Sequence, residues 1–130
     1  ENFLQVDPAA QRPVPLFVML SDTVWNGDSA TVQLTFGPQV VQMANALKAR
    51  PGSKISIYAH TDSHGPAAEL AAQTLAQAQS LKDILVAQGV TPDSIQIFGK
   101  GDTEPVATEE TPDGKQINRR VELVVSGLYD

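Results

Sequence analysis

Cysteine is absent from the 130-residue chain, which excludes a disulfide framework and thiolate metal sites. This absence does not fix the compartment, because many domains of oxidising compartments also lack cysteine. Aromatic residues make up only 5% of the chain, so we expect a core of Val, Leu, Ile and Ala. No run approaches the roughly 18 consecutive apolar residues that a membrane-spanning helix requires.

Basic residues are also scarce. Nine Lys and Arg stand against 15 Asp and Glu, and the formal net charge is -6. A field of this sign does not attract nucleic acid or anionic lipid, so no nucleic-acid partner is expected. Arg119–Arg120 is the only adjacent basic pair and marks the one local basic site.

The chemical repertoire is small. There are two histidines, and neither a G-x-S-x-G elbow nor a phosphate-cradling loop occurs. We therefore expect no enzymatic activity, no cofactor and no metal. No signal peptide is recognisable, and the start at Glu1 leads us to expect a processed or trimmed product. Any membrane anchor would lie outside this chain.

Length and patterning predict an extended lead-in at residues 1–15 and one domain at residues 16–130. Asn26-Gly27 between two strand-like runs predicts a β-hairpin over residues 16–36. Periodicity and Gly/Pro signals then predict a helix from Gly37-Pro38 to Pro51-Gly52, a strand at 54–59, a polar loop at 60–65, a helix from Pro66 to Gly89, a strand at 94–98, a loop at 99–118 and a strand at 119–126. Strands separated by helices imply parallel pairing, and the last strand, which no helix precedes, makes the sheet mixed.

The long helix at residues 66–89 is expected to bury one stripe of side chains. The stripe comprises Ala71, Leu75, Ala78, Leu81 and Leu85, widened by Ile84. Gln73, Gln77 and Ser80 are expected on a neighbouring polar face.

Four motifs follow one another at characteristic spacing. They are a strand ending in His60-Thr61-Asp62, a long helix ending at Gly89, the segment Gly99-Lys-Gly-Asp-Thr-Glu-Pro105, and Asn118-Arg119-Arg120-Val-Glu entering the last strand. Together, over roughly residues 36 to 126, they resemble the OmpA-like, peptidoglycan-associated domain family.

The resemblance implies an α/β fold of the α+β sandwich type: a βαβαβ-β mixed sheet with two main helices on one face, here preceded by the N-terminal hairpin. It also implies a periplasmic, outer-membrane-associated module of a Gram-negative bacterium. Such a module binds the diaminopimelate-containing peptide stem of peptidoglycan without covalent chemistry and anchors an outer-membrane protein, lipoprotein or envelope machine to the cell wall.

Carried over residue by residue, the implied peptidoglycan-binding residues are Thr61, Asp62, Asn118, Arg119 and Arg120, with Gln77 at the position of the family's helix Arg. The family Asp contacts the amino end of diaminopimelate and the family Arg pairs with its carboxylate. Gln offers one neutral amide where Arg offers two charged hydrogen bonds. The exchange is expected to weaken binding about tenfold to a hundredfold, unless another cation takes the role.

Alternative interpretations stay open for each feature. Asp62 could cap loop amides, Arg119 and Arg120 could form structural ion pairs, and Gln77 could be solvated. His60, Asp62 and His64 could form a metal cluster, although alternate loop residues rarely converge. For the whole chain, the alternative is a degenerate domain that has lost peptidoglycan binding and serves as a protein-interaction subunit of a secretion or conjugation apparatus.

Overall fold

The computed structural model describes residues 15–126, so the predicted lead-in lies outside the described residues except for Pro15. The elements in chain order are β1 (Phe17–Leu20), α1 (Ser21–Val24), a 3₁₀ turn (Leu34–Phe36), α2 (Gly37–Lys48), β2 (Lys54–His60), α3 (Ala67–Ala87), a second 3₁₀ turn (Pro92–Ser94), β3 (Ile95–Gly101), α4 (Pro112–Asn118) and β4 (Arg120–Ser126). Among the helices of these residues, none combines the length and apolarity needed to cross a bilayer.

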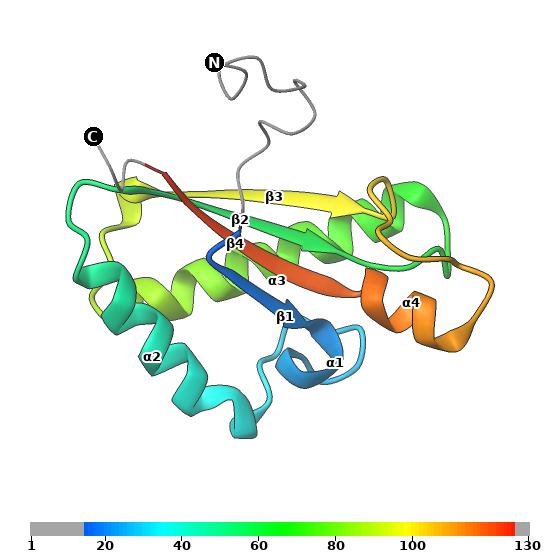
Figure 1. Ribbon diagram of the computed structural model, residues 1–130, viewed down its shortest axis with the longest axis horizontal. Coiled ribbons are helices and arrows are strands. Elements are labelled where there is room, and N and C mark those ends of the chain that lie inside the picture. Colours follow the sequence, from blue (N-terminus) through cyan, green and yellow to red (C-terminus); the bar gives the residue numbers. More distant parts are fainter. Residues whose placement is uncertain (1–14, 127–130) are drawn as a thin grey trace, which may run out of the picture.

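The four strands form one mixed sheet in the order β1-β4-β2-β3. β2 and β3 run parallel, joined by the crossover helix α3, while β4 runs antiparallel to both β2 and β1. Helices α2 and α3 cover the same face of this sheet (Figure 1). The predicted mixed sheet with two main helices on one face is therefore confirmed.

The core lies between this sheet face and the two helices. Ile57 of β2 is in register with Ile97 of β3 and Leu123 of β4, so three aliphatic side chains point together toward the helices. From α2, the predicted residues Val40, Met43, Ala44 and Leu47 complete the packing. Gly89 ends α3 with a positive φ of 104°, and Val90 N donates to Leu85 O at 3.0 Å, as expected of a glycine cap.

For the predicted hairpin at residues 16–36, the structure confirms the turn at Asn26-Gly27 but not the paired strands on either side of it. Gly27 adopts φ 62°, and Ser29 N donates to Asn26 O at 3.2 Å. However, only one isolated bridge, Trp25 to Val32, joins the two arms. The backbone of β1 is instead paired with β4, and the chain then turns into the short helix α1. β4 pairs with one edge of β1, and the chain leaves that strand at Ser21, so the arm after Gly27 does not extend the sheet beside β1.

The predicted buried stripe of α3 is wrong in its first two turns. The buried residues are Leu70, Thr74, Gln77, Ala78, Leu81 and Leu85, whereas Ala71 is exposed and Leu75 is 47% exposed. The cause is the close approach of β3: a Cβ on Gly99 would lie 2.6 Å from Leu75 Cα. The helix backbone therefore rests directly on the glycine-containing end of β3, and the Leu75 side chain points away.

The predicted loop at 99–118 contains helix α4. Thr111 caps this helix, its Oγ1 accepting a hydrogen bond from Gly114 N at 3.0 Å, and Pro112 occupies the first turn, where its missing N–H costs nothing. Gly114 has no room for a side chain, because a Cβ would meet the backbone and side chain of Thr108. The helix thus packs tightly against the loop before it and leads directly into β4.

Candidate functional site

The site begins where β2 ends. Thr61 N donates to Gly101 O at 2.9 Å, which ties the chain after β2 to the end of β3. The next residue, Asp62, is 4% exposed. A buried carboxylate must be paired with hydrogen-bond donors or cations, so its partners define the site.

Arg119 is the first partner of Asp62. Its Nη1 donates to Asp62 Oδ2 at 2.6 Å. Its Nε donates to Asp22 Oδ1 at 2.9 Å, and its Nη2 donates to Asp22 Oδ2 at 3.0 Å. One guanidinium therefore joins two carboxylates that stand 40 positions apart in the sequence. The hydrogen bonds to Asp22 and Asp62 raise the pKa of Arg119, and the hydrogen bond from Arg119 lowers the pKa of Asp22.

His64 is the second partner of Asp62. Its Nδ1 contacts Asp62 Oδ1, and its Nε2 lies 3.5 Å from Asp28 Oδ2. Burial works to raise the pKa of Asp62, but hydrogen bonds from His64 and Arg119 outweigh it and the pKa is lowered. The hydrogen bond to Asp62 and the charges of Asp62 and Asp28 raise the pKa of His64.

Arg120 does not join this cluster. Arg119 is the extended residue just before β4, and Arg120 is the first residue of that strand, so their side chains point to opposite sides. Arg119 reaches Asp62, while Arg120 lies buried on the other side. There Arg120 Nε donates to Glu122 Oε2 at 2.7 Å and Nη2 to Glu104 O at 3.0 Å. Of the two arginines predicted for the site, Arg119 contacts the Asp62 carboxylate, whereas Arg120 forms an ion pair with Glu122 within the domain.

Asn118 is fully buried and bonds only within the domain. Its Oδ1 accepts from Val106 N and Ala107 N at 2.8 and 2.9 Å. Its Nδ2 donates to Ala107 O at 2.9 Å and to Glu109 Oε2. The other oxygen of Glu109 accepts from Ser63 N at 2.9 Å, so Asn118 braces the loop that borders the site.

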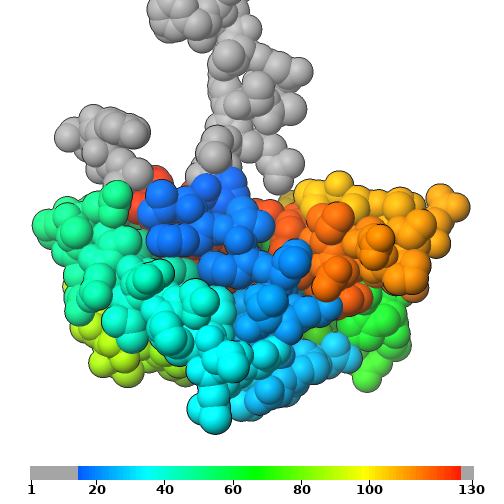
Figure 2. Space-filling model, turned by 60° about the horizontal axis from the view of Figure 1, so that its bottom comes forward, coloured from blue at the N-terminus to red at the C-terminus, as the bar shows by residue number. Residues whose placement is uncertain are grey.

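Gln77 is neither solvated nor in contact with Asp62. The side chain is 2% exposed, and Nε2 donates to Ser29 O at 3.1 Å. This bond holds the turn Asn26–Ser29 against α3 (Figure 2 shows the light-blue turn beside the green start of that helix). The amide that replaces the expected arginine is thus already engaged within the protein.

The metal interpretation of His60, Asp62 and His64 is not supported by their positions. His60 is buried, with its Nε2 3.8 Å from Glu122 Oε1, whereas His64 faces Asp62 and Asp28. Within residues 15–126, no group of three His, Cys, Asp or Glu side chains could hold a metal ion.

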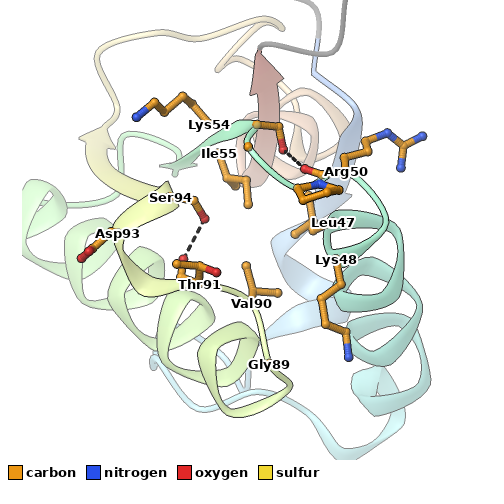
Figure 3. A pocket seen from close by; sticks show the side chains of 13 residues that line it. Leu47, Lys48, Arg50, Lys54, Ile55, Gly89, Val90, Thr91, Asp93 and Ser94 are labelled. Carbon is orange, nitrogen blue, oxygen red and sulfur yellow. Dashed lines mark hydrogen bonds between the residues drawn. The ribbon is translucent and has the colours of Figure 1, made fainter.

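A hollow of about 520 Å³ lies at the other end of the sheet (Figure 3). It opens beside Ile55 at the start of β2 and is lined by Leu47, Val90 and a rim that includes Lys48 and Arg50. None of the predicted binding residues lines it. The hollow and the Asp62 cluster are thus separate features, because β2 runs from one to the other.

Sequence reasoning missed two members of the cluster, Asp22 and Asp28, and considered His64 only as a metal ligand. Asp22 pairs with a residue 97 positions away, which no local pattern signals, whereas Asp28 follows Asn26-Gly27 and could have been noticed as a turn residue. Three carboxylates here face one guanidinium and one imidazole. The excess of negative charge makes the cluster attract a cation and repel an anion.

Several known proteins are similar to this chain in sequence and in structure. The peptidoglycan-binding protein ArfA of Mycobacterium tuberculosis is 38% identical over 85 residues, which is 65% of this chain and 26% of that protein. The chain therefore spans about a quarter of that relative. Among solved structures, the cell wall anchor of the T6SS from Pseudomonas aeruginosa is 30% identical, with a TM-score of 0.76 over 95% of this chain and 94% of that one. The peptidoglycan-associated lipoprotein from Burkholderia pseudomallei is 26% identical, with a TM-score of 0.74 over 92% and 99%.

The OmpA family model matches residues 24–119. The match starts at Val24, whereas the sequence motifs placed the start of the resemblance near residue 36. Residues 24–36 are therefore part of the family domain and are not an added hairpin. The match covers the greater part of the chain and includes Asp62, His64 and Arg119. The chain belongs to the OmpA family.

Proposed function

We propose that this domain binds the peptide stem of peptidoglycan and anchors a larger envelope protein or machine to the cell wall. Asp62 accepts the ammonium group of diaminopimelate, and Arg119 holds Asp62 in place. The observation that carries this proposal is the buried, ionised Asp62 carboxylate at the end of β2 in an OmpA-family domain. Relatives named as peptidoglycan-binding, peptidoglycan-associated and cell-wall-anchoring proteins support the same ligand.

The charge of the cluster supports an ammonium as the recognised group. Arg119 and a protonated His64 contribute two positive charges against the three carboxylates of the cluster, so a ligand ammonium gains attraction from one excess negative charge. The engaged Gln77 amide gives no charged partner to a ligand carboxylate. We therefore expect a weaker grip on the carboxylate end of diaminopimelate than on its amino end.

The site lies in the periplasm in this proposal, and outer-membrane proteins among the relatives support it: outer membrane porin F of Pseudomonas fluorescens is 33% identical over 80% of this chain. Other envelope or secretion-apparatus proteins would be the remaining partners.

Co-sedimentation with purified sacculi tests the binding role. The wild-type chain is expected to pellet with sacculi, and Asp62→Asn, which keeps the side-chain shape but removes the charge, to lose most of this binding. Asp93→Asn is the matched control, because Asp93 lines the hollow at the opposite end of the sheet. Equal pelleting of the wild type and Asp62→Asn would contradict the proposed role of Asp62.

A second candidate is a domain that has lost peptidoglycan binding and serves only as a protein-interaction subunit of an envelope apparatus. Its supporting observation is the bond from Gln77 to Ser29, which closes the position of the expected arginine. This candidate predicts no wild-type binding to sacculi. Gln77→Arg tests whether the pocket has merely been blocked: the longer side chain must displace the turn Asn26–Ser29, and binding gained by this variant alone would favour the second candidate.

A further inference from the structure

His64 occupies an unusual place, because each of its two ring nitrogens faces a carboxylate. Nδ1 contacts Asp62 Oδ1, and Nε2 lies 3.5 Å from Asp28 Oδ2. A neutral imidazole carries one N–H and can donate to one carboxylate only, whereas an imidazolium donates to both. The observed arrangement is therefore the one that a protonated His64 stabilises.

The two carboxylates belong to segments that are distant in sequence. Asp62 is in the loop after β2, and Asp28 is in the turn Asn26–Ser29. Apart from this ion pair, the bond from Gln77 to Ser29 O links the turn to α3. His64 thus ties the turn to the Asp62 site, and without its proton the two carboxylates would repel each other across the ring.

The groups around the ring favour its charged form. Asp62 and Asp28 face it from the loop and the turn, and Gln73 faces it from α3. Arg119, just before β4, is paired with Asp62 and opposes a second positive charge there, but it is itself also paired with Asp22. The ring is one-third exposed, so protons and ligands can reach it from solvent.

We propose that His64 is a built-in competitor for the ligand ammonium. Its imidazolium occupies the cation position on Asp62 and fastens the turn Asn26–Ser29 beside it. Loss of the proton removes the positive charge from Asp62 and leaves a single N–H for the two carboxylates. This inference rests on the proposed binding of an ammonium at Asp62. It follows that ligand affinity rises as the pH passes upward through the range in which His64 gives up its proton, although the ammonium keeps its charge throughout.

Sacculus binding measured at about pH 5.5 and about pH 8 tests the competition. Wild-type affinity is expected to rise about tenfold between the two, because the ligand no longer displaces a charged hydrogen bond. His64→Gln, which cannot carry a charge, should bind equally at both pH values and as tightly as the wild type at the higher one. Asp28→Asn is the matched control for the turn. It removes the charge that faces His64 Nε2 but keeps the His64–Asp62 contact, so the affinity for sacculi should retain part of its pH dependence. Identical pH dependence in wild type and His64→Gln would overturn the proposal.

NMR titration of the 130-residue chain, without ligand, separates this inference from the proposed function. The His64 ring is expected to titrate above the ordinary histidine value of 6.5, the amides of the turn Asn26–Ser29 to shift with the same midpoint, and Asp62→Asn to lower that midpoint. A ring that titrates at or below 6.5, or turn amides that do not follow it, would refute the proton-dependent contact. If the coupled titration is present but no variant binds sacculi at either pH, the contact stands and the peptidoglycan assignment fails.

Discussion

Asn118→Ala is expected to be among the most destabilising single substitutions in the domain. Asn118 is 0% exposed and makes four hydrogen bonds, to the backbone of Val106 and Ala107 and to the carboxylate of Glu109. At about 1 kcal/mol per bond the loss is about 4 kcal/mol. Because Val106 is 60% exposed, water can reach part of the loop, and we expect a net loss of about 3 kcal/mol.

Urea unfolding followed by circular dichroism measures this loss directly. A shift in the midpoint at constant m-value would show that stability alone has changed, and the melting temperature is expected to fall by about 10 °C. Gln42→Ala on the exposed side of α2 is the control and should stay within about 0.5 kcal/mol of the wild type. A change of that small size for Asn118→Ala would refute the reasoning, since it would mean that the loop finds other hydrogen-bond partners.

Asn118→Asp tests the contact between residue 118 and Glu109. The carboxylate can still accept from Val106 N and Ala107 N but cannot donate, and it places a second negative charge beside Glu109. We expect this variant to be at least as unstable as Asn118→Ala at neutral pH and to recover relative to wild type on acidification, when the two carboxyls can share a proton. Destabilisation that does not depend on pH would show that Glu109 turns away.

Two further predictions concern packing and pH. His60 is 2% exposed, and neither of its ring nitrogens has a hydrogen-bond partner. Burial together with the charge of Arg120 lowers the pKa of His60 to about 4. On acidification the unfolded chain therefore takes up this proton before the folded one, and the free energy of unfolding should fall by up to about 3 kcal/mol between pH 6.5 and 4. The difference in stability between wild type and His60→Leu across this range measures the effect, and a constant difference would contradict it. Gly99→Ala would bring a Cβ to 2.6 Å from Leu75 Cα and push α3 away from β3. Thermal unfolding should show that the free energy of unfolding falls by about 3 kcal/mol. An unchanged melting temperature would show that the helix can move at little cost.

Local patterns predicted the elements that carry their own signals. Val40, Met43 and Leu47 recur at helical spacing, and Val121, Leu123 and Val125 alternate as a strand, so α2 and β4 were correctly predicted. In α3 the pattern was ambiguous, because alanine occurs all round the helix and does not distinguish a buried side from an exposed one. The contact of Gly99 with the helix backbone at Leu75 sets that choice, and a contact between residues 24 positions apart leaves no periodic trace in the sequence.

The residues predicted to bind the ligand were also foreseen only in part. His60-Thr61-Asp62 and Asn118-Arg119-Arg120 could be read as motifs, and the structure joins Asp62 to Arg119. Which residues of the second motif face the site could not be read from the motif itself. Asn118 is turned inward by its loop contacts and Arg120 by strand alternation, while Gln77, predicted as a ligand contact or a solvated residue, is buried against Ser29.

By itself, then, the sequence determined the family, the order of the main strands and helices and the presence of a carboxylate after β2, because these depend on short-range spacing. Only the tertiary structure decided that Asp22, Asp28 and His64 meet at that carboxylate. Their charges belong to segments separated by tens of residues, and it is the packing of the turn Asn26–Ser29 against α3 and of β1 against β4 that brings them within reach of one another.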